Sequence, residues 1–559
     1  MLILNILTYV AAGIFIAASF MSLRRFRGAA RGPTVRHEGE TLADGSQGST
    51  VTIGTWPSDD IDVSGCEGYF PDSGRFEIEA GAGGVTEKEL KRAGIDVGGS
   101  VYRFIEELEF TAPVRKRTAK SGAALIVAPL LFTGLRAAAV FVRYGSVTVT
   151  VPFMIIAAYI LTACAMRADR RPVVELSFAM LLTYYVDAAL YGSAGDPAAV
   201  ASYAGDAALG VALYTGFALA ASLMLRIDFS RRVGRLTLHQ WLRIAAGVVI
   251  IALIVLNVAL ARQINGAYNW ITVFGVTFQP SEVVKALFVF VVILPFGTVL
   301  SGRRMVFEAA FVAVCFAYGY LIRDTGFLIQ IGAVFLAAVI IQARNAAQVI
   351  LLAALSVFGC ALVATTSRTA ASRISGWLAD GKVTSLFEAL SATGVTESPD
   401  NYGYQSMHAL VAAFRNGAFA GNDGFDVLTG IEAANSDLVT SYLAQIYGYF
   451  ILAVILALYL LMVFAVIQGV RSQNKLQQKL SCISMALIAL AMVMNMAGTF
   501  GILPLTGVVS PALSDGMSSA VCYGALFGAV SASDAGYIRP YVLRGREGER
   551  TGARGAAAC

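Results

Sequence analysis

Apolar runs of about 20 residues recur along most of the chain. A helix of that length crosses the hydrocarbon core of a membrane, so the runs are candidate spans. We expect about thirteen of them, near residues 2–21, 121–143, 149–167, 172–192, 203–226, 241–262, 281–300, 305–322, 324–342, 346–365, 441–468, 479–499 and 513–533. The 559 residues are 57% hydrophobic and only 14% charged, which excludes an ordinary soluble enzyme. The sequence therefore predicts an all-α polytopic membrane protein.

Basic clusters between the runs predict how the chain is oriented. If the N-terminus lies outside and each span reverses direction, every cluster falls on the cytoplasmic side, as the positive-inside rule requires. The clusters include Arg24-Arg25, Arg115-Lys116-Arg117, Arg303-Arg304 and the Arg-rich tail at 536–559. We therefore expect a multi-pass protein of the cell membrane with a cytoplasmic C-terminus. The net charge of +5 is spread over these clusters and gives no indication of nucleic-acid binding.

Two long segments are too polar to cross the membrane. Residues 28–120 are Gly-rich and contain short alternating runs at 75–79 and 101–105, which predict strands of a small cytoplasmic β domain. Residues 366–437 form a polar loop that we expect outside, and loops of this length are usually functional or disordered. The first apolar run has no small-residue cleavage site after it, so we interpret residues 1–22 as an anchor.

Metal and disulfide chemistry have little support in the sequence. The seven cysteines are scattered, mostly inside apolar runs, without Cys-x-x-Cys spacing, and there are only three histidines. We expect buried thiols, with no disulfide framework, structural zinc or haem. Arg136 and Asp187 lie within spans, where we expect them to face the bundle interior or to reach an interface.

The segment from Asn265 to Lys285 carries the most informative motif. It reads Gly266-Ala-Tyr-Asn-Trp-Ile271 and then Phe278-Gln-Pro-Ser-Glu-Val-Val-Lys285. This resembles the Gly-Ala-Arg-Arg-Trp-Ile and Phe-Gln-Pro-Ser-Glu-x-x-Lys signature of the SEDS family of RodA, FtsW and SpoVE cell-wall polymerases. Tyr268 and Asn269 replace the two arginines of the family. A purely structural interpretation is that Pro280-Ser281-Glu282 simply starts a helix.

Further blocks follow in the order of the family. They are Arg323-Asp324-Thr-Gly326, Arg373-Ile374, Gly403-Tyr-Gln405, Asn435-Ser-Asp437, and Asn495 with Gly501-Ile-Leu-Pro-Leu-Thr-Gly-Val508 and the serines up to Ser519. The resemblance implies that residues 169–535 are a SEDS core, that residues 121–168 are two additional spans, and that the fold is shared.

The family's reaction gives these residues candidate roles. SEDS proteins resemble glycosyltransferases that polymerise lipid II outside the membrane, with undecaprenyl diphosphate as the leaving group. Such a reaction needs a carboxylate to accept a proton and positive charge at the diphosphate. The resemblance places five residues at the substrate, which are Arg373, Lys285, Glu282, Gln405 and Asp437. Lys285 has an alternative, because Glu282 lies one helical turn away and can pair with it.

The expected catalytic position departs from the family. Aligned on Gly403-Tyr-Gln405, Ser398 occupies the position of the family's proposed catalytic Asp. A serine cannot act as the base unaided, which leaves Glu397 and Asp400 as candidates. Asp400 follows Pro399 and equally fits a turn residue. Gln445 and Ile446 replace two glutamates of the family, so the expected site carries less charge than usual.

Residues 51–104 carry a second resemblance, to a forkhead-associated (FHA) β-sandwich. Val51-Thr-Ile-Gly54 and Ser73-Gly-Arg-Phe-Glu-Ile78 follow the family pattern, but Thr55 replaces the phosphate-binding Arg and Phe76 the His. A phosphothreonine site without its arginine binds poorly. We expect a β domain that docks a partner or the helices.

Three functions remain open on the sequence. The first is lipid II polymerisation in division, elongation or sporulation, with a class B penicillin-binding protein (a transpeptidase) and divisome or elongasome proteins as partners. The second is a catalytically impaired SEDS scaffold, favoured by Ser398. The third is a transporter of lipid-linked precursors. No cofactor is required, although a divalent cation, Mg²⁺ or Mn²⁺, would suit a diphosphate.

Overall fold

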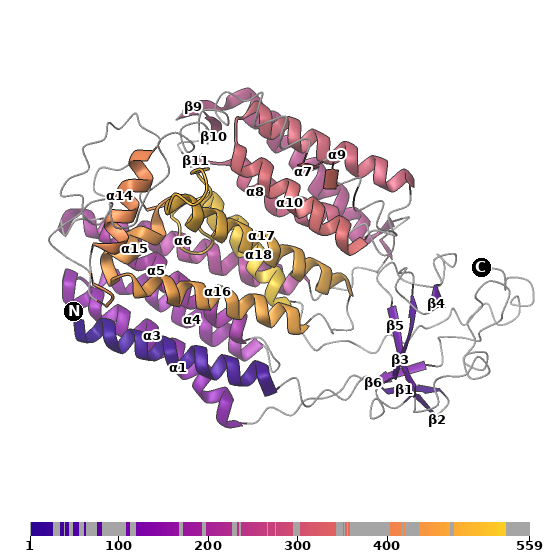
Figure 1. Ribbon diagram of the computed structural model, residues 1–559, viewed down its shortest axis with the longest axis horizontal. Coiled ribbons are helices and arrows are strands. Elements are labelled where there is room, and N and C mark those ends of the chain that lie inside the picture. The colour runs from indigo at the N-terminus through magenta and orange to yellow at the C-terminus, as the bar shows by residue number, and fades with distance from the viewer. Residues whose placement is uncertain are drawn as a thin grey trace, which may run out of the picture.

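The computed structural model describes most of the helical part of the chain and short pieces of the remainder. The described residues are 2–25, 34–37, 40–43, 49–54, 61–62, 75–80, 108–111, 119–166, 172–192, 197–225, 232–233, 236–264, 267–273, 276–293, 302–342, 350, 353–354, 356–357, 403–415, 417–419, 435–469 and 475–532. Long helices lying side by side dominate this part of the molecule (Figure 1).

The helices follow the apolar runs of the sequence. They are α1 (Leu2–Arg25), α3 (Ala119–Tyr144), α4 (Val151–Met166), α5 (Pro172–Tyr191), α6 (Pro197–Met224), α7 (Leu238–Leu260), α8 (Pro280–Ile293), α9 (Gly302–Leu321), α10 (Thr325–Gln342), α14 (Gly403–Phe414), α15 (Val439–Tyr447), α16 (Phe450–Gly469), α17 (Lys475–Thr499) and α18 (Met517–Ala532), with a 3₁₀ turn at Thr148–Thr150. The all-helical architecture that the sequence predicts is confirmed.

Eight helices in the described part of the chain are long and apolar enough to cross a membrane. They are α1, α3, α4, α5, α6, α7, α16 and α17, and shorter apolar stretches lie at Ala309–Leu321, Thr325–Ile340 and Met517–Ser531. The expected span at 346–365 lies almost entirely outside the described residues. The difference from about thirteen expected spans thus reflects shorter helices in the second half and the limits of the described part.

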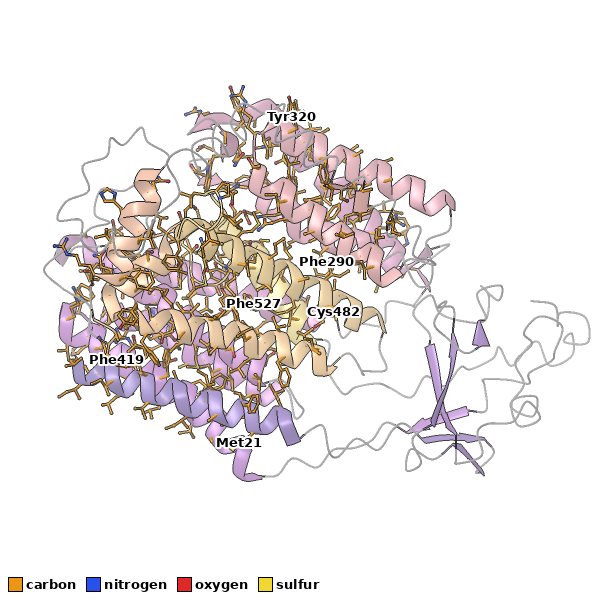
Figure 2. All side chains as sticks on the ribbon, in the orientation of Figure 1. Met21, Phe290, Tyr320, Phe419, Cys482 and Phe527 are labelled. Carbon is orange, nitrogen blue, oxygen red and sulfur yellow. The ribbon has the colours of Figure 1, made fainter. Side chains whose placement is uncertain are left out.

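Side-chain burial matches a bundle surrounded by lipid. Val248 and Val255 of α7 are 63% and 61% exposed, whereas α5 is buried along almost its whole length. Aliphatic side chains exposed along one helix are costly in water but not against acyl chains. Met21 lies on the outside of α1, and Phe527 of α18 lies within the bundle (Figure 2). We conclude that α5 is central and α7 peripheral.

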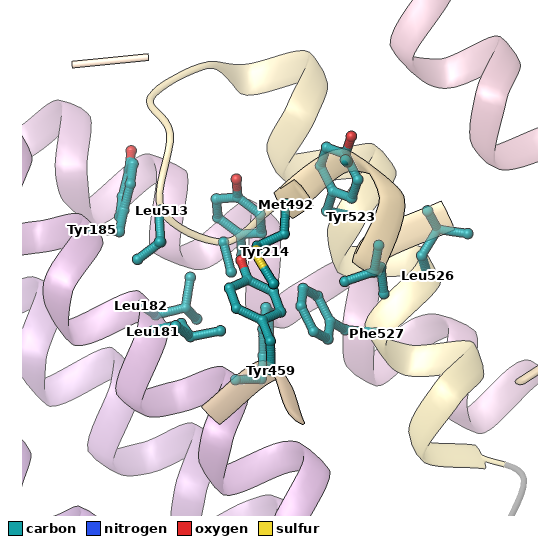
Figure 3. Close-up of a cluster of buried hydrophobic side chains, with 14 of the residues drawn as sticks. Leu181, Leu182, Tyr185, Tyr214, Tyr459, Met492, Leu513, Tyr523, Leu526 and Phe527 are labelled. Carbon is teal, nitrogen blue, oxygen red and sulfur yellow. The ribbon is translucent and has the colours of Figure 1, made fainter. Parts of the chain in front are cut away.

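Helix α18 packs closely along α6. Gly524 and Gly528 are four residues apart, and a Cβ on either would clash with the backbone oxygen of Tyr214 or Ala218. Small residues at this spacing allow two membrane helices to approach closely. A buried cluster that includes Tyr214 and Phe527 lies beside this contact (Figure 3). The ring of Phe527 also packs on Phe178 of α5, with the two ring centroids 4.3 Å apart. This packing fixes the position of α18, the helix that follows the Gly501–Val508 block.

A short antiparallel sheet precedes α8. Its strands are β9 (Arg262–Ile264), β10 (Ala267–Val273) and β11 (Val276–Phe278), in the order β11-β10-β9. Ile271 pairs with Phe278 and Val273 with Val276, so only two residues connect β10 to β11. The expected helix start is confirmed, since α8 begins at Pro280, whose missing N–H costs nothing in a first turn. The sheet itself was not predicted.

The polar N-terminal region contains two separate three-stranded sheets. Their orders are β2-β1-β6 and β4-β3-β5, formed by β1 (Thr34–His37), β2 (Glu40–Ala43), β3 (Ser49–Gly54), β4 (Ile61–Asp62), β5 (Arg75–Ala80) and β6 (Leu108–Thr111). Strand β5 confirms the run predicted at 75–79, while the run at 101–105 falls outside the described residues. The described strands do not show a β-sandwich.

A further two-stranded ladder, between α6 and α7, joins β7 (Arg232–Val233) and β8 (Leu236–Thr237).

One expectation about the second half was wrong in detail. The single span expected at 441–468 is two helices, because the chain turns at Gly448 (φ +88°) between α15 and α16. A Cβ at Gly448 would clash with the carbonyl of Gly417, so only glycine fits there. The loop expected at 366–437 also contains a helix, α14.

Candidate functional site

Asp324 joins three elements at the start of α10. Its Oδ1 accepts a 2.8 Å hydrogen bond from the backbone N–H of Phe327, as an N-cap residue does. Its Oδ2 accepts from Asn269 Nδ2 of β10 at 3.1 Å, and Gln279 Nε2 and Ser281 Oγ lie at 3.4 Å. The signature segment before α8 and the Asp324 block are therefore held together by one carboxylate.

Lys285 and Glu282 form a buried ion pair on α8. Lys285 Nζ lies 2.7 Å from Glu282 Oε1 and 2.6 Å from Gln330 Oε1 of α10, and both charged side chains are almost completely buried. Glu282 Oε2 has no hydrogen-bond partner among the described residues. The alternative weighed from the sequence is thus present, because the pair neutralises both charges within the bundle.

Asp437 is fixed through its backbone. Its carbonyl oxygen accepts hydrogen bonds from Asn495 Nδ2 at 2.8 Å and Thr499 Oγ1 at 3.1 Å. Its Oδ2 lies 3.4 Å from the point where a Cβ on Gly507 would be, so the carboxylate faces the connection between α17 and α18. Gly507 has φ +68°, a conformation that favours glycine.

The 500–516 connection brings these groups to one end of the helices. A Cβ at Gly326 would lie 2.6 Å from a methyl group of Val508, next to the Asp324 block. The backbone N–H of Gln279 donates to Ser518 Oγ at 2.7 Å, and Ser514 Oγ donates to the carbonyl of Ser436 at 2.6 Å. Segments far apart in the sequence therefore converge on this connection and the start of α18.

Gln405 lies in the first turn of α14 and is half-buried. Helix α14 packs against α15 and α17, which places the Gly403-Tyr-Gln405 motif on the helix next to the one that follows Asp437. Arg373, Glu397, Ser398 and Asp400 lie outside the described residues. The structure therefore brings together Glu282, Lys285 and the Asp324 block, and separately fixes Asp437, whereas the candidate bases stay predictions.

Asp515 is a residue that the sequence interpretation missed. Its Oδ1 accepts a hydrogen bond from Tyr185 of α5 at 3.3 Å, and its backbone N–H donates to the carbonyl of Asn435 at 3.2 Å. Desolvation of its carboxyl beside Tyr185 raises the pKa of Asp515 above its ordinary value, although the residue as a whole is exposed. The signal was its position between Ser514 and Gly516, which both fit the last signature.

Tyr268 and Asn269, which stand at the positions of the two family arginines, both contact the Arg323-Asp324 block. Asn269 donates to Asp324, and the ring of Tyr268 lies 5.4 Å from the Arg323 guanidinium. Within the described residues, no group of three or more His, Cys, Asp or Glu is placed to hold a metal ion. The arrangement offers carboxylates, which suit acid–base work, and one amine that is already paired with Glu282.

Comparison with known proteins places more than half of the chain in one group. The FtsW/RodA/SpoVE family, described as cell cycle protein, matches residues 203–535. The probable peptidoglycan glycosyltransferase FtsW of Helicobacter pylori is 25% identical over 314 residues, 53% of this chain and 79% of that protein. The peptidoglycan glycosyltransferase RodA of Mycobacterium tuberculosis is 23% identical over 350 residues, 58% of this chain and 70% of that protein.

A solved structure also aligns with the chain. It belongs to a peptidoglycan synthase complex and concerns the coordination of polymerization and crosslinking. The two chains are 18% identical, with a TM-score of 0.46, and the alignment covers 64% of this chain and 96% of the other.

Proposed function

Because the chain belongs to the FtsW/RodA/SpoVE family of cell cycle proteins, we propose that it is a peptidoglycan glycosyltransferase. It polymerises lipid II on the outer face of the cytoplasmic membrane. The acceptor sugar hydroxyl attacks the anomeric carbon of the donor, the bond to the diphosphate breaks, and the hydroxyl proton passes to a carboxylate. Undecaprenyl diphosphate leaves.

One observation carries the proposal. The family match spans residues 203–535, and its signature segments at 267–285, 323–326, 435–437 and 495–519 meet at one end of the bundle. Residues of one site must converge although they are far apart in sequence, and a chance likeness of apolar helices gives no such convergence.

The residues divide into four roles. Arg373 grips the departing diphosphate, because a guanidinium can bind phosphate oxygens through two bonds. Glu397 or Asp400 accepts the proton, since Ser398 cannot. Lys285 holds Glu282 and Gln330 at the base of the site, and Gln405 and Asp437 contact the sugar moieties. We assign the leaving-group charge to Arg373.

The same proposal includes the membrane topology of the enzyme and its partner proteins. The N-terminus lies outside, while the region at 28–120 and the tail at 536–559 are cytoplasmic. A class B penicillin-binding protein crosslinks the strands that this chain makes, and divisome or elongasome proteins localise it. The region at 28–120 is a small β domain that docks one of these proteins.

A glycan polymerisation assay on the purified full-length chain tests the activity, with and without a class B penicillin-binding protein. The wild type makes polymer, R373M makes less than a tenth as much, and loss of activity in either E397Q or D400N identifies the base. Wild-type protein that binds lipid II but makes no polymer in either condition overturns the proposal.

A second candidate is a non-catalytic scaffold of the same family. Ser398 at the expected acidic position favours it. A scaffold binds lipid II or partner proteins without turnover, and E397Q and D400N then leave its cellular function unchanged. Complementation of a deletion strain by the E397Q/D400N double variant separates the two functions.

A further inference from the structure

We propose that Arg136, Asn5 and Tyr9 are positioning residues, which hold α14 and α15 in place beside the site. The three residues lie on α1 and α3, outside residues 203–535 that match the family. The inference rests on the proposed function for its effect on turnover, but its structural part stands on contacts alone.

Arg136 is the centre of a buried polar network. Its Nε donates to Asp187 Oδ2 of α5 at 2.9 Å, and its Nη1 donates to Asn5 Oδ1 of α1 at 2.8 Å. The hydroxyl of Tyr447, the last residue of α15, donates to the same Asp187 oxygen. The Arg136 guanidinium also lies 4.4 Å from the centre of the Tyr447 ring. All four side chains are almost completely buried, so the network ties α15 to three other helices.

Tyr9 of α1 makes a second connection to the same place. Its hydroxyl donates to the backbone oxygen of Tyr447 at 3.0 Å. Its ring meets Phe419 and Phe450 edge-on, with centroids 6.1 and 5.3 Å away. Phe419 lies just after α14 and Phe450 begins α16. Tyr9 therefore contacts the last residue of α15, the first residue of α16 and the segment that follows α14.

Tyr9 and Arg136 contact a place where two segments of the chain pack closely together. The backbone N–H of Phe450 donates to the carbonyl of Ala418 at 3.0 Å, and a Cβ at Gly448 would clash with the carbonyl of Gly417. We call residues 417–419 and 447–450 the α14–α16 junction. No side chain can be added at Gly448, so this close contact between the two segments requires glycine.

Each of the two segments of the junction is connected by one short helix to a residue of the site. Helix α15 has nine residues, and its first residue, Val439, is two residues after Asp437. Helix α14 begins with Gly403-Tyr-Gln405 and ends three residues before the junction. Nine helical residues span only about 14 Å, so a shift of Tyr447 reaches Asp437 through one rigid helix.

Buried ion pairs of this kind are better suited to fixing a position than to adding stability. Replacing both partners by apolar residues is often neutral, whereas removing one leaves an unpaired buried charge. R136M therefore destabilises the chain, and the R136M/D187L double variant regains its stability. The double variant still lacks the acceptor for the Tyr447 hydroxyl, so it does not regain the position of α15.

Hydrogen exchange of the full-length chain in nanodiscs tests the contacts without any need for activity. In R136M/D187L, amides of α14 and α15 exchange about fivefold faster, as the loss of one buried hydrogen bond predicts, while α6 and α18 exchange at the wild-type rate. T133V is the matched control, because it removes the 3.1 Å hydrogen bond between Thr133 and Thr183, which also joins α3 to α5. T133V leaves α14 and α15 unchanged.

Turnover supplies the second measurement. In the polymerisation assay, R136M/D187L lowers kcat about fivefold with KM within about twofold, and Y9F gives a smaller loss in the same direction. Equal exchange of α14 and α15 in wild type and R136M/D187L overturns the inference, as does an equal effect of T133V. If the wild type has no polymerase activity, the exchange result still decides the positioning role, and only the proposed function fails.

Discussion

The Lys285–Glu282 pair gives the sharpest prediction about how the site is built. Both side chains are almost completely buried, and Lys285 also contacts Gln330 Oε1 at 2.6 Å. K285M keeps the volume but leaves the Glu282 carboxylate without its cation. Removing one partner of a buried pair costs about 3–5 kcal/mol, so we expect the free energy of unfolding to fall by about that amount.

A double-mutant cycle separates the pair from other effects of the substitutions. E282Q leaves Lys285 unpaired and costs a similar amount, whereas K285M/E282Q removes both charges and is more stable than the sum of the single losses predicts. Denaturant titration of the purified chain in micelles gives the four free energies. R323M is the control, since Arg323 is exposed and its contact with Tyr268 is worth about 0.5–1 kcal/mol.

A K285M variant with unchanged stability would contradict this prediction. K285M that unfolds like the wild type but loses lipid II binding would show that Lys285 faces substrate and that the pair with Glu282 contributes nothing to stability. Burial of the two side chains would then not indicate a stabilising pair.

Three further predictions concern groups around the same end of the bundle. D324A removes the cap of α10 and the partner of Asn269, so we expect a loss of at least about 1 kcal/mol in denaturant titration, whereas D324N loses less. G528L prevents the close approach of α18 to α6 and lowers the unfolding temperature and the yield of folded protein, while a substitution at the uncrowded Gly134 does neither. Desolvation of its carboxyl raises the pKa of the otherwise exposed Asp515, so the folded state holds its proton more tightly than the unfolded state, and solvent screening keeps the effect small. Stability therefore falls as pH rises above about 4 towards the raised pKa, and an unchanged pH slope in D515N would contradict this assignment.

The length and composition of the apolar runs were enough to predict the helices. Each long run needs an internally hydrogen-bonded backbone in lipid, which leaves few alternatives to a helix. Pro280 followed by Ser281 and Glu282 predicted the start of α8, because a first turn tolerates proline and favours an acidic side chain. Local chemistry of this kind is readable without the tertiary structure.

The interruptions and pairings were not readable in the same way. Gly448 lies in an apolar run that continues on both sides, so only the contact with Gly417 shows why the helix breaks there. Asp187 could be predicted to face the interior, which is confirmed, but not to share its oxygen between Arg136 and Tyr447. Such partners come from helices 51 and 260 residues away, and spacing along the chain does not specify them.

The replacement of two family arginines by Tyr268 and Asn269 changes charge more than geometry. Asn269 still donates a hydrogen bond to Asp324, so β10 stays attached to the start of α10. An amide brings no positive charge, however, and the Asp324 carboxylate is balanced instead by neutral donors and the N-terminus of α10. This end of the bundle is therefore less attractive to a diphosphate than one that carries both arginines. Under the proposed function, Arg373 must supply more of that attraction, which makes it the residue whose loss should weaken lipid II binding most.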